Sequence, residues 1–252
     1  MTEHTNDMTN AAYSEAYLKY RRETEADIFI RSAFEDAEED ALSDSLVWAR
    51  KHYFHTVGDR MYRGSENTIL RDGNQIYSFR NLENSGEFCK LIHHSNGNDY
   101  LLFRRDLYGY SVLNLSTLED FHYYPACNVG NSKETFIWCD PIYNPHNDLL
   151  AVYGCYWGWP YTLILADFTD PFTPAENQAY IPSKKDIGDV ETYLWQKNTL
   201  IIHSEHSKWK KGKKPKKGQG FNGFYVKKNT IVTNKTHKII DALCRKWLNE
   251  PQ

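Results

Sequence analysis

The N-terminal part of the chain has apolar residues at helical spacing. No Gly or Pro occurs in residues 1–57, and acidic residues fill the positions between the apolar ones. The apolar stripe follows steps of three, four and seven and consists of Ile30, Phe34, Ala37, Ala41 and Trp48. Such steps keep side chains on one face of a helix. The pattern predicts one long or two shorter helices over residues 11–50, inside an N-terminal helical segment of residues 1–57.

The pattern changes after Gly58. Short apolar runs alternate with turn clusters such as RDGNQ, HSNGND and NVGNSKE, which is typical of strands joined by turns. A β domain is therefore expected over residues 58–234. Apolar residues four apart return in KTHKIIDALCRKWLNEPQ and predict a C-terminal helix over residues 235–252, packed with the rest into one globular unit.

Similar runs recur in the β region about every fifty residues. They begin at Asp99 with DYLLF, at Asp148 with DLLAV and at Asn198 with NTLII. Each run is followed by a connection and a second strand, so repeat units are expected near residues 99–147, 148–197 and 198–234. Four short strands per period of this length are typical of a propeller blade.

The runs LLAVY and TLILA are apolar at both alternating positions, as required when both faces of a sheet are covered. The expected fold is mainly β with helical termini, as a propeller-like stack of three to four short antiparallel sheets. The sequence leaves open whether this stack closes into a ring or is open or partial. A degenerate further unit is expected in NTILRDGNQIYSFRNLENSGEFCKLI. The alternative is an ordinary β-rich domain in which the spacing is coincidental.

Stacked units would bring three connections to one rim. The connections are RRDLYG, GCYWGWP and the lysine-rich SKWKKGKKPKKGQG, which has seven lysines in residues 208–217. The rim would carry Arg104 and Arg105 as well as the candidate binding residues. These candidates are Tyr108, Tyr156, Trp157, Trp159, Lys208, Lys210, Lys211, Lys213 and Lys214.

Three functions are compatible with this rim. Trp and Tyr in a Gly- and Pro-rich connection are rigid anchors, which favours a non-enzymatic module that recognises a protein or peptide. Large aromatic rings also commonly cap a core, and that interpretation stays open. The lysines favour nucleic-acid binding, although the net charge of −3 is unusual for a dedicated nucleic-acid protein.

A hydrolase acting on carbohydrate or another small molecule is the enzymatic alternative. Its acids would be Asp140, Asp167, Asp170 or Glu205, which lie near expected strand ends. Aspartates at such positions also hydrogen-bond the backbone of turns. The chain has no GxSxG, GxxxxGK[ST], GxGxxG or HExxH motif, so no residue is assigned as catalytic and no cofactor is expected.

Cysteine usage and hydropathy favour a cytoplasmic location. The five cysteines are scattered without a CxxC pair, which favours reduced thiols and no zinc site. The start of the chain does not resemble a signal peptide, and no run of eighteen apolar residues occurs. No metal and no membrane contact are expected, and the sequence leaves the oligomeric state open.

Charge is distributed unevenly. Residues 1–50 hold twelve acids and five bases, whereas residues 201–252 hold three acids and thirteen bases. The basic end could attract an acidic partner, or the two ends could attract each other.

One segment resembles a family of uncharacterised bacterial proteins. The resemblance is carried by YNPHNDLLAVYGCYWGWPYTLILADFTDP and extends back through YLLFRRDLYGYSVLNL, covering about residues 98–172. It implies a fold of propeller-like β repeats and a bacterial source. It implies no activity and no catalytic residue.

Overall fold

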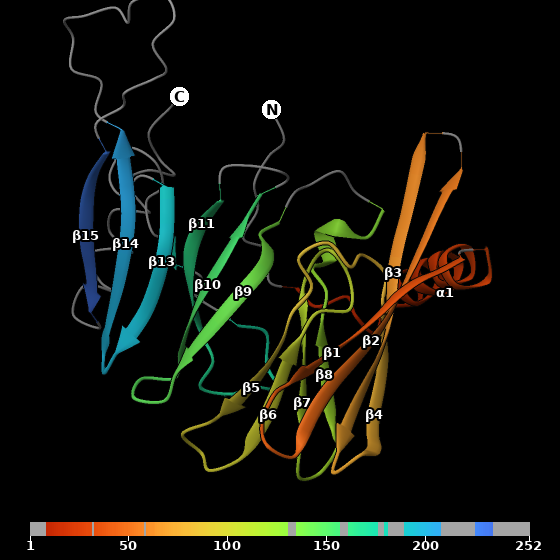
Figure 1. Ribbon diagram of the computed structural model, residues 1–252, viewed down its shortest axis with the longest axis horizontal. Coiled ribbons are helices and arrows are strands. Elements are labelled where there is room, and N and C mark those ends of the chain that lie inside the picture. The colour runs from red at the N-terminus through yellow and green to blue at the C-terminus, as the bar shows by residue number, and fades with distance from the viewer. Residues whose placement is uncertain are drawn as a thin grey trace, which may run out of the picture.

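The described part of the protein is mainly β and consists of four antiparallel sheets stacked in chain order (Figure 1). The computed structural model describes residues 9–31, 33–57, 59–130, 135–156, 161–175, 179–180, 189–207 and 225–233. Within these residues, α1 spans Glu15–Arg31 and the short 3-10 helix η1 spans Ala126–Asn128.

Each sheet is a local unit formed by strands that follow one another in the chain. Sheet 1 contains β1 (Ala33–Ala41), β2 (Leu46–Val57), β3 (Arg60–Arg71) and β4 (Asn74–Asn81). Sheet 2 contains β5 (Cys89–His93), β6 (Asp99–Phe103), β7 (Tyr110–Asn114) and β8 (Asp120–Tyr123). Sheet 3 contains β9 (Ile137–Asn144), β10 (Leu149–Cys155), β11 (Tyr161–Asp167) and β12 (Ala179–Tyr180). Sheet 4 contains β13 (Asp189–Gln196), β14 (Thr199–Ser207) and β15 (Tyr225–Thr233).

Three apolar layers hold the sheets together. In β6, Leu101 packs into the layer shared with sheet 1, whereas Leu102 packs into the layer shared with sheet 3. In β10, Leu150 faces sheet 2 and Ala151 faces sheet 4. Successive side chains point to opposite faces of a strand, so strands that are apolar at both parities fill the layers on both sides.

The predicted mainly β, propeller-like stack of small antiparallel sheets is confirmed, and the stack of the described residues is open. The runs expected to begin at Asp99, Asp148 and Asn198 coincide with β6, β10 and β14, and each of these is the second strand of its sheet. Sheet 4 lies at one end of the stack, and sheet 1 with α1 lies at the other (Figure 1). The segment expected to form one degenerate unit instead supplies β3 and β4 to sheet 1 and β5 to sheet 2.

The prediction of helix over residues 11–50 is wrong beyond Arg31. Residues 33–41 form β1, and residues 46–57 form β2, so β structure begins well before residue 58. The apolar stripe is not one helical face, because Phe34 is exposed on β1 while Trp48 is buried on β2. Pairing of β2 with β3 along its whole length overrides the helical propensity of the sequence. The predicted C-terminal helix of residues 235–252 lies outside the described residues.

Helix α1 packs on the outer face of sheet 1. Gly64 of β3 lies beneath its last turns, and a side chain there would approach Ile28 Cγ2 to 2.8 Å and the carbonyl oxygen of Asn81 to 2.9 Å. Ile28 is 1% exposed. The close approach of helix to strand therefore requires glycine at position 64. Among the described residues, no helix has the length and apolar character that crossing a membrane requires.

A buried charge network fixes α1 against two sheets. Arg21 Nη1 lies 2.8 Å from Asp106 Oδ2, and Arg21 Nη2 lies 2.8 Å from Glu25 Oε1. Nη2 also donates to the carbonyl oxygen of Arg80 at the end of β4 (3.0 Å). Tyr17 donates to the same carboxylate oxygen of Asp106 (2.5 Å). The network joins α1 to sheet 1 and to the connection between β6 and β7.

Replacing Asp106 with Asn should destabilise the protein by about 3 kcal/mol, because it leaves the buried Arg21 guanidinium without its main counter-ion. Urea unfolding at neutral pH measures the loss. Glu23→Gln is the matched control, since it breaks the exposed Lys19–Glu23 pair and should cost less than about 0.5 kcal/mol. Equal losses in the two variants would contradict a structural role for the buried network.

Candidate functional site

The predicted rim is described only in part. Tyr108 lies in the connection after β6, and Tyr156 lies directly after β10. The strands β10 and β14 run in the same direction, towards the top of the view in Figure 1, as the rim hypothesis requires of these two strands. Of the other predicted rim residues, Trp157, Trp159 and the lysines of residues 208–217 lie outside the described residues.

Tyr108 and Tyr156 are both half-buried in apolar contacts. Tyr108 packs against a small cluster formed by Ala12, Tyr17 and Tyr124. A hydrogen bond from Ala11 N to the carbonyl oxygen of Tyr124 (2.8 Å) holds the N-terminal segment against this cluster. Tyr156 packs edge to face on Phe136 with ring centroids 5.5 Å apart. Both rings contribute to the core as well as to the surface.

Arg104 does not belong to the rim surface, contrary to the prediction. It is 1% exposed and donates to the carbonyl oxygens of Trp138 (2.9 Å) and Glu83 (3.1 Å), and to that of Ser85. Burial lowers the pKa of its guanidinium. The side chain links sheet 3 to the connection between sheets 1 and 2, which is a structural role.

The aspartates considered for hydrolysis are engaged in structural bonds. Asp167 Oδ1 accepts from the backbone N–H of Thr169 (2.9 Å), and Asp170 Oδ1 accepts from that of Phe172 (3.0 Å). Both are turn contacts of the kind that short polar side chains commonly make. The side chain of Glu205 lies outside the described residues.

Asp140 joins three sheets. Its Oδ1 lies 2.7 Å from Nζ of Lys90 on β5, and Tyr193 of β13 donates both to its Oδ2 and to its carbonyl oxygen (2.8 Å). Burial and the hydrogen bond to Asp140 raise the pKa of the Tyr193 hydroxyl, which is therefore protonated and donates. Both oxygens of Asp140 are occupied, so this carboxylate acts as a clamp between sheets.

One triad-like arrangement was not anticipated from the sequence. Ser111 Oγ lies 2.9 Å from His122 Nδ1, and His122 Nε2 lies 3.5 Å from Asp120 Oδ2. Ser111 and His122 are direct cross-strand neighbours on β7 and β8. Ser111 is only 2% exposed, so a substrate cannot reach its hydroxyl. The group is a polar network within sheet 2.

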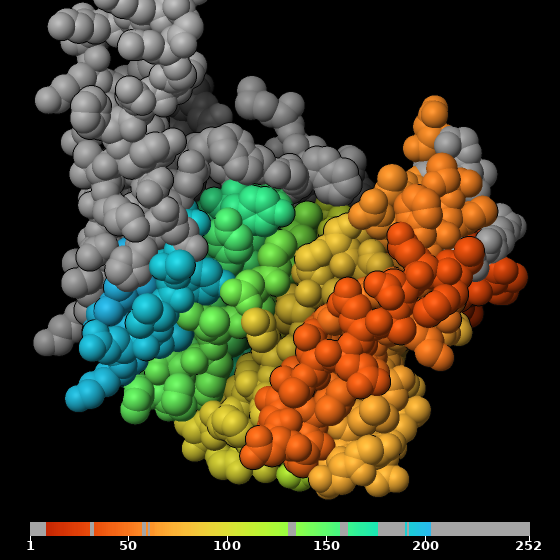
Figure 2. Space-filling view, in the orientation of Figure 1, coloured from red at the N-terminus to blue at the C-terminus, as the bar shows by residue number. Residues whose placement is uncertain are grey.

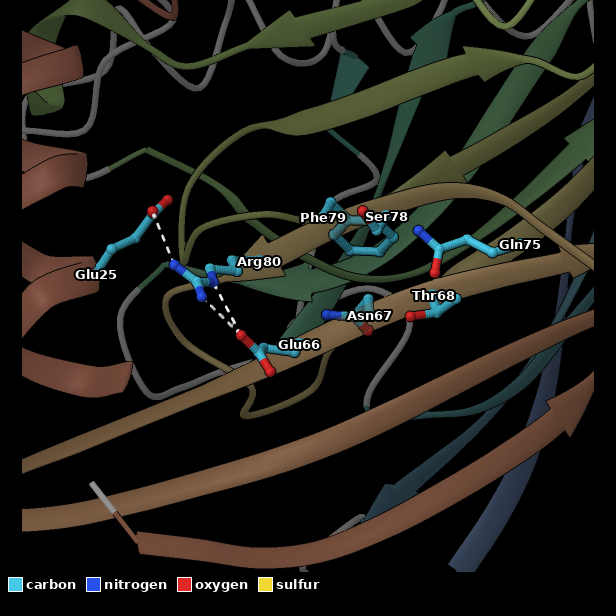
Figure 3. Close-up of a pocket in the computed structure, with 8 residues that line it drawn as sticks. All are labelled: Glu25, Glu66, Asn67, Thr68, Gln75, Ser78, Phe79 and Arg80. Carbon is cyan, nitrogen blue, oxygen red and sulfur yellow. Dashed lines mark hydrogen bonds and ion pairs between the residues drawn. The ribbon is translucent and has the colours of Figure 1, made fainter. Parts of the chain in front are cut away.

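A shallow pocket lies beside α1 on sheet 1 and has a volume of about 490 Å³ (Figure 3). Arg80 dominates it, with Nη2 at 2.7 Å from Glu66 Oε1 and Nη1 at 3.7 Å from Glu25 Oε2. Its guanidinium also lies 4.6 Å from the ring centre of Phe29. Two carboxylates already neutralise this cation, so the pocket has little attraction for an anionic ligand. The described residues hold no group of three or more His, Cys, Asp or Glu placed to bind a metal ion.

The most unusual surface is β1. Every one of its nine residues, AFEDAEEDA, is exposed. It pairs only with β2, and no strand of the described chain pairs with its other edge. Figure 2 shows β1 running diagonally across the front of the molecule with its length uncovered. The strand therefore offers a free backbone edge and two open faces.

Five carboxylates line β1, and only two of them are neutralised. Arg50 Nη2 lies 2.7 Å from Glu38 Oε2 and 2.6 Å from Asp40 Oδ2. The other three, Glu35, Asp36 and Glu39, form no ion pair with any described residue. The sequence pointed correctly to an exposed acidic surface here but assigned it to a helix. Its signal was the density of acids in FEDAEED.

Exposed apolar side chains stand at the beginning of β1. Ile30, near the end of α1, is 80% exposed, and Phe34 is 58% exposed. Phe34 lies opposite Tyr53 of β2, with ring centroids 6.4 Å apart. The acidic edge thus ends at an open aromatic corner.

Comparison with known proteins gives one partial likeness. The chain is 31% identical over 101 residues to an uncharacterised protein of Acanthamoeba polyphaga mimivirus. The aligned region covers 40% of this chain and 38% of the mimivirus protein. No protein-family model and no solved structure matches the chain. The relative is described as uncharacterised, in line with the resemblance that residues 98–172 carry, but its source is viral.

The His122 network should make stability fall on acidification. Burial lowers the pKa of His122 below 6.5, and the hydrogen bond to His122 lowers the pKa of Asp120 from 3.8 to about 2. The unfolded chain therefore binds protons more readily at both sites, and stability is lost as pH falls, first through about 6.5 at His122 and then through about 3.8 at Asp120. His122→Gln should flatten the unfolding free energy between pH 7 and 5.

Urea unfolding across this pH range measures the slope. His93→Gln is the control, because His93 is an exposed histidine paired with an aspartate at 2.7 Å. An unchanged slope in His122→Gln would show that the buried network is not the acid-sensitive group.

Proposed function

We propose that the protein is a non-enzymatic binding module that holds an extended segment of another protein along the free edge of β1. The observation that carries this proposal is the complete exposure of a nine-residue strand, one edge of which pairs with no strand in the part of the chain that the structure describes. Extended segments commonly bind proteins by adding a strand to such an edge.

The energetics of β1 favour a partner. Ordering a residue costs about 1–2 kcal/mol of backbone entropy, and strands usually recover this by burying apolar side chains. β1 buries none, and it consists of Ala, Glu and Asp apart from Phe34, residue types that are depleted in strands. Its order rests on pairing with β2 and on the bonds from Arg50. An added strand would supply hydrogen bonds to its second edge.

A binding role also agrees with the use of the other candidate groups. Asp140, Asp167 and Asp170 are occupied by clamps and turns, and Ser111 is buried. The proposed surface differs from the predicted aromatic and basic rim because Tyr108 and Tyr156 are packed against neighbouring rings. Two alternatives rest on the sequence alone. They are hydrolysis, and nucleic-acid binding through the lysines of residues 208–217.

A cytoplasmic location is part of the proposal. It is supported by the described cysteines, Cys89, Cys127, Cys139 and Cys155, all of which are free thiols, as expected in a reducing compartment. A bacterial source and a family of β repeats likewise remain proposals, and they rest on the resemblance of residues 98–172.

Strand addition can be tested with N-methylated peptides. The probes are three labelled nine-residue peptides of alternating Val and a variable residue, which is Lys, Gln or Glu. At least one should bind, as measured by fluorescence anisotropy. In that peptide, N-methylation of the alternate amides on one edge should weaken binding at least roughly tenfold, through lost backbone hydrogen bonds. N-methylation of the opposite edge should leave binding unchanged.

Two outcomes would contradict strand addition. One is that none of the three peptides binds. The other is that both methylation patterns have the same effect, since only one edge of an added strand can face β1.

An Ala37→Pro variant tests whether the peptide binds at β1. Proline disrupts the middle of β1, so this variant should abolish binding. Ser116→Pro, in the exposed turn after β7, is the control and should not affect binding.

A further inference from the structure

We infer, on the basis of the strand addition proposed above, that the segment received by β1 is rich in lysine or arginine and places an apolar residue against Phe34. The free edge shows where a strand can add. The side chains beside that edge decide which sequence fits it.

The charge on β1 selects against acidic and neutral segments. Side chains directly opposite each other on neighbouring antiparallel strands lie about 4.5–5.5 Å apart. An added strand would therefore place its side chains beside Glu35, Asp36 and Glu39, which have no ion pair within the described chain. Opposite charges at these positions stabilise pairing, and like charges destabilise it.

Both faces of β1 carry this charge. Glu38 and Asp40 lie opposite Arg50 and Trp48 of β2 and share the face that carries the Arg50 guanidinium. Glu39 lies opposite Ala49 and occupies the other face. A segment with basic residues at successive positions would thus meet carboxylates on both sides of the sheet.

Pairing of β1 with a second copy of itself is disfavoured by the same charges. Two acidic edges in register would bring carboxylates of both copies together, and charges on edge strands are a known protection against such pairing. A nucleic-acid backbone, which is also anionic, is repelled for the same reason. The charges on β1 therefore disfavour a second copy of β1 and nucleic acid, and favour a cationic polypeptide.

The aromatic corner sets one end of the segment. Phe34 is 58% exposed at the start of β1, and Ile30, four residues earlier near the end of α1, is 80% exposed. Aromatic side chains pair favourably with β-branched or aromatic neighbours across strands. A Val, Ile or aromatic residue at one end of the basic segment would cover Phe34 and fix the register of the added strand.

The three peptides described above separate charge from backbone pairing. The Lys peptide should bind roughly tenfold tighter than the Gln peptide, and the Glu peptide should not bind measurably. Raising the salt concentration should weaken the Lys peptide and leave the Gln peptide unchanged, because exposed charge pairs are screened.

Neutralising the three acids of β1 that form no ion pair with described residues tests whether they cause the preference for the Lys peptide. The triple variant Glu35→Gln, Asp36→Asn, Glu39→Gln should bring the affinity for the Lys peptide down to that for the Gln peptide. The matched control is Glu15→Gln, Glu23→Gln, Glu119→Gln, which removes three exposed acids from α1 and from the turn before β8. The control should bind like the wild type, and circular dichroism checks that both variants keep their strands.

Phe34→Ala tests the aromatic corner. It should weaken a Lys peptide that ends in Val and leave unchanged a Lys peptide that ends in Ser. Equal effects on both peptides would overturn the assignment of the apolar end.

The remaining outcomes distinguish this inference from the proposed function. If the Lys and Gln peptides bind equally with a one-edge methylation effect, the charge inference fails and strand addition stands. If the variant Glu35→Gln, Asp36→Asn, Glu39→Gln still binds the Lys peptide more tightly than the Gln peptide, the basic segment binds elsewhere and the inference fails. If no peptide binds, strand addition fails, and the inference falls with it.

Discussion

The structure depends on the requirement that strands with two apolar faces be covered on both sides. β6, β7, β10 and β11 are apolar at successive positions, and no single sheet can bury such strands. Stacking four sheets with three layers between them meets this requirement. The stack is open, so its ends must be completed by other elements. At one end α1 packs on sheet 1, and β1 is left with a free edge.

Charged side chains complete the stack where apolar packing cannot. Asp106 holds Arg21 of α1, and Asp140 holds Lys90 and Tyr193 across neighbouring sheets. Breaking the buried Arg21–Asp106 pair leaves a charge without its partner, which is costly inside a protein. The Lys90–Asp140 pair is 43% and 41% exposed, so its loss costs less. Most of the carboxylates considered for catalysis form contacts between sheets, as Asp140 does, or accept hydrogen bonds from the backbone of turns, as Asp167 and Asp170 do. Three acids that form no ion pair with any described residue, Glu35, Asp36 and Glu39, stand together on β1, and this concentration connects the architecture to the proposed binding surface.

The sheets were predictable from sequence because their signal is local. Runs such as LLAVY and TLILA, bounded by turns, carry both the strand and its two buried faces. In the first sheet, β1 and β2 were assigned to a helix, whereas β3 and β4 fall in the predicted β region. The segment AFEDAEEDA has the composition of a helix, and its strand conformation depends on pairing with β2. Arg104 was expected on the surface and is buried, because its partners are carbonyl oxygens of Glu83, Ser85 and Trp138, which sequence spacing does not reveal. The Ser111–His122–Asp120 network was missed for the same reason, since it depends on the register of β7 and β8.

Amide hydrogen exchange of the free protein tests the central claim most directly. If β1 is an edge that gains its stability from a partner, its amides should exchange through local opening, at free energies well below those of β6, β7, β10 and β11. The central strands should exchange only with global unfolding. Amides of β1 protected to the same level as those of the central strands would contradict the account, because β1 would then be fully stable without a partner.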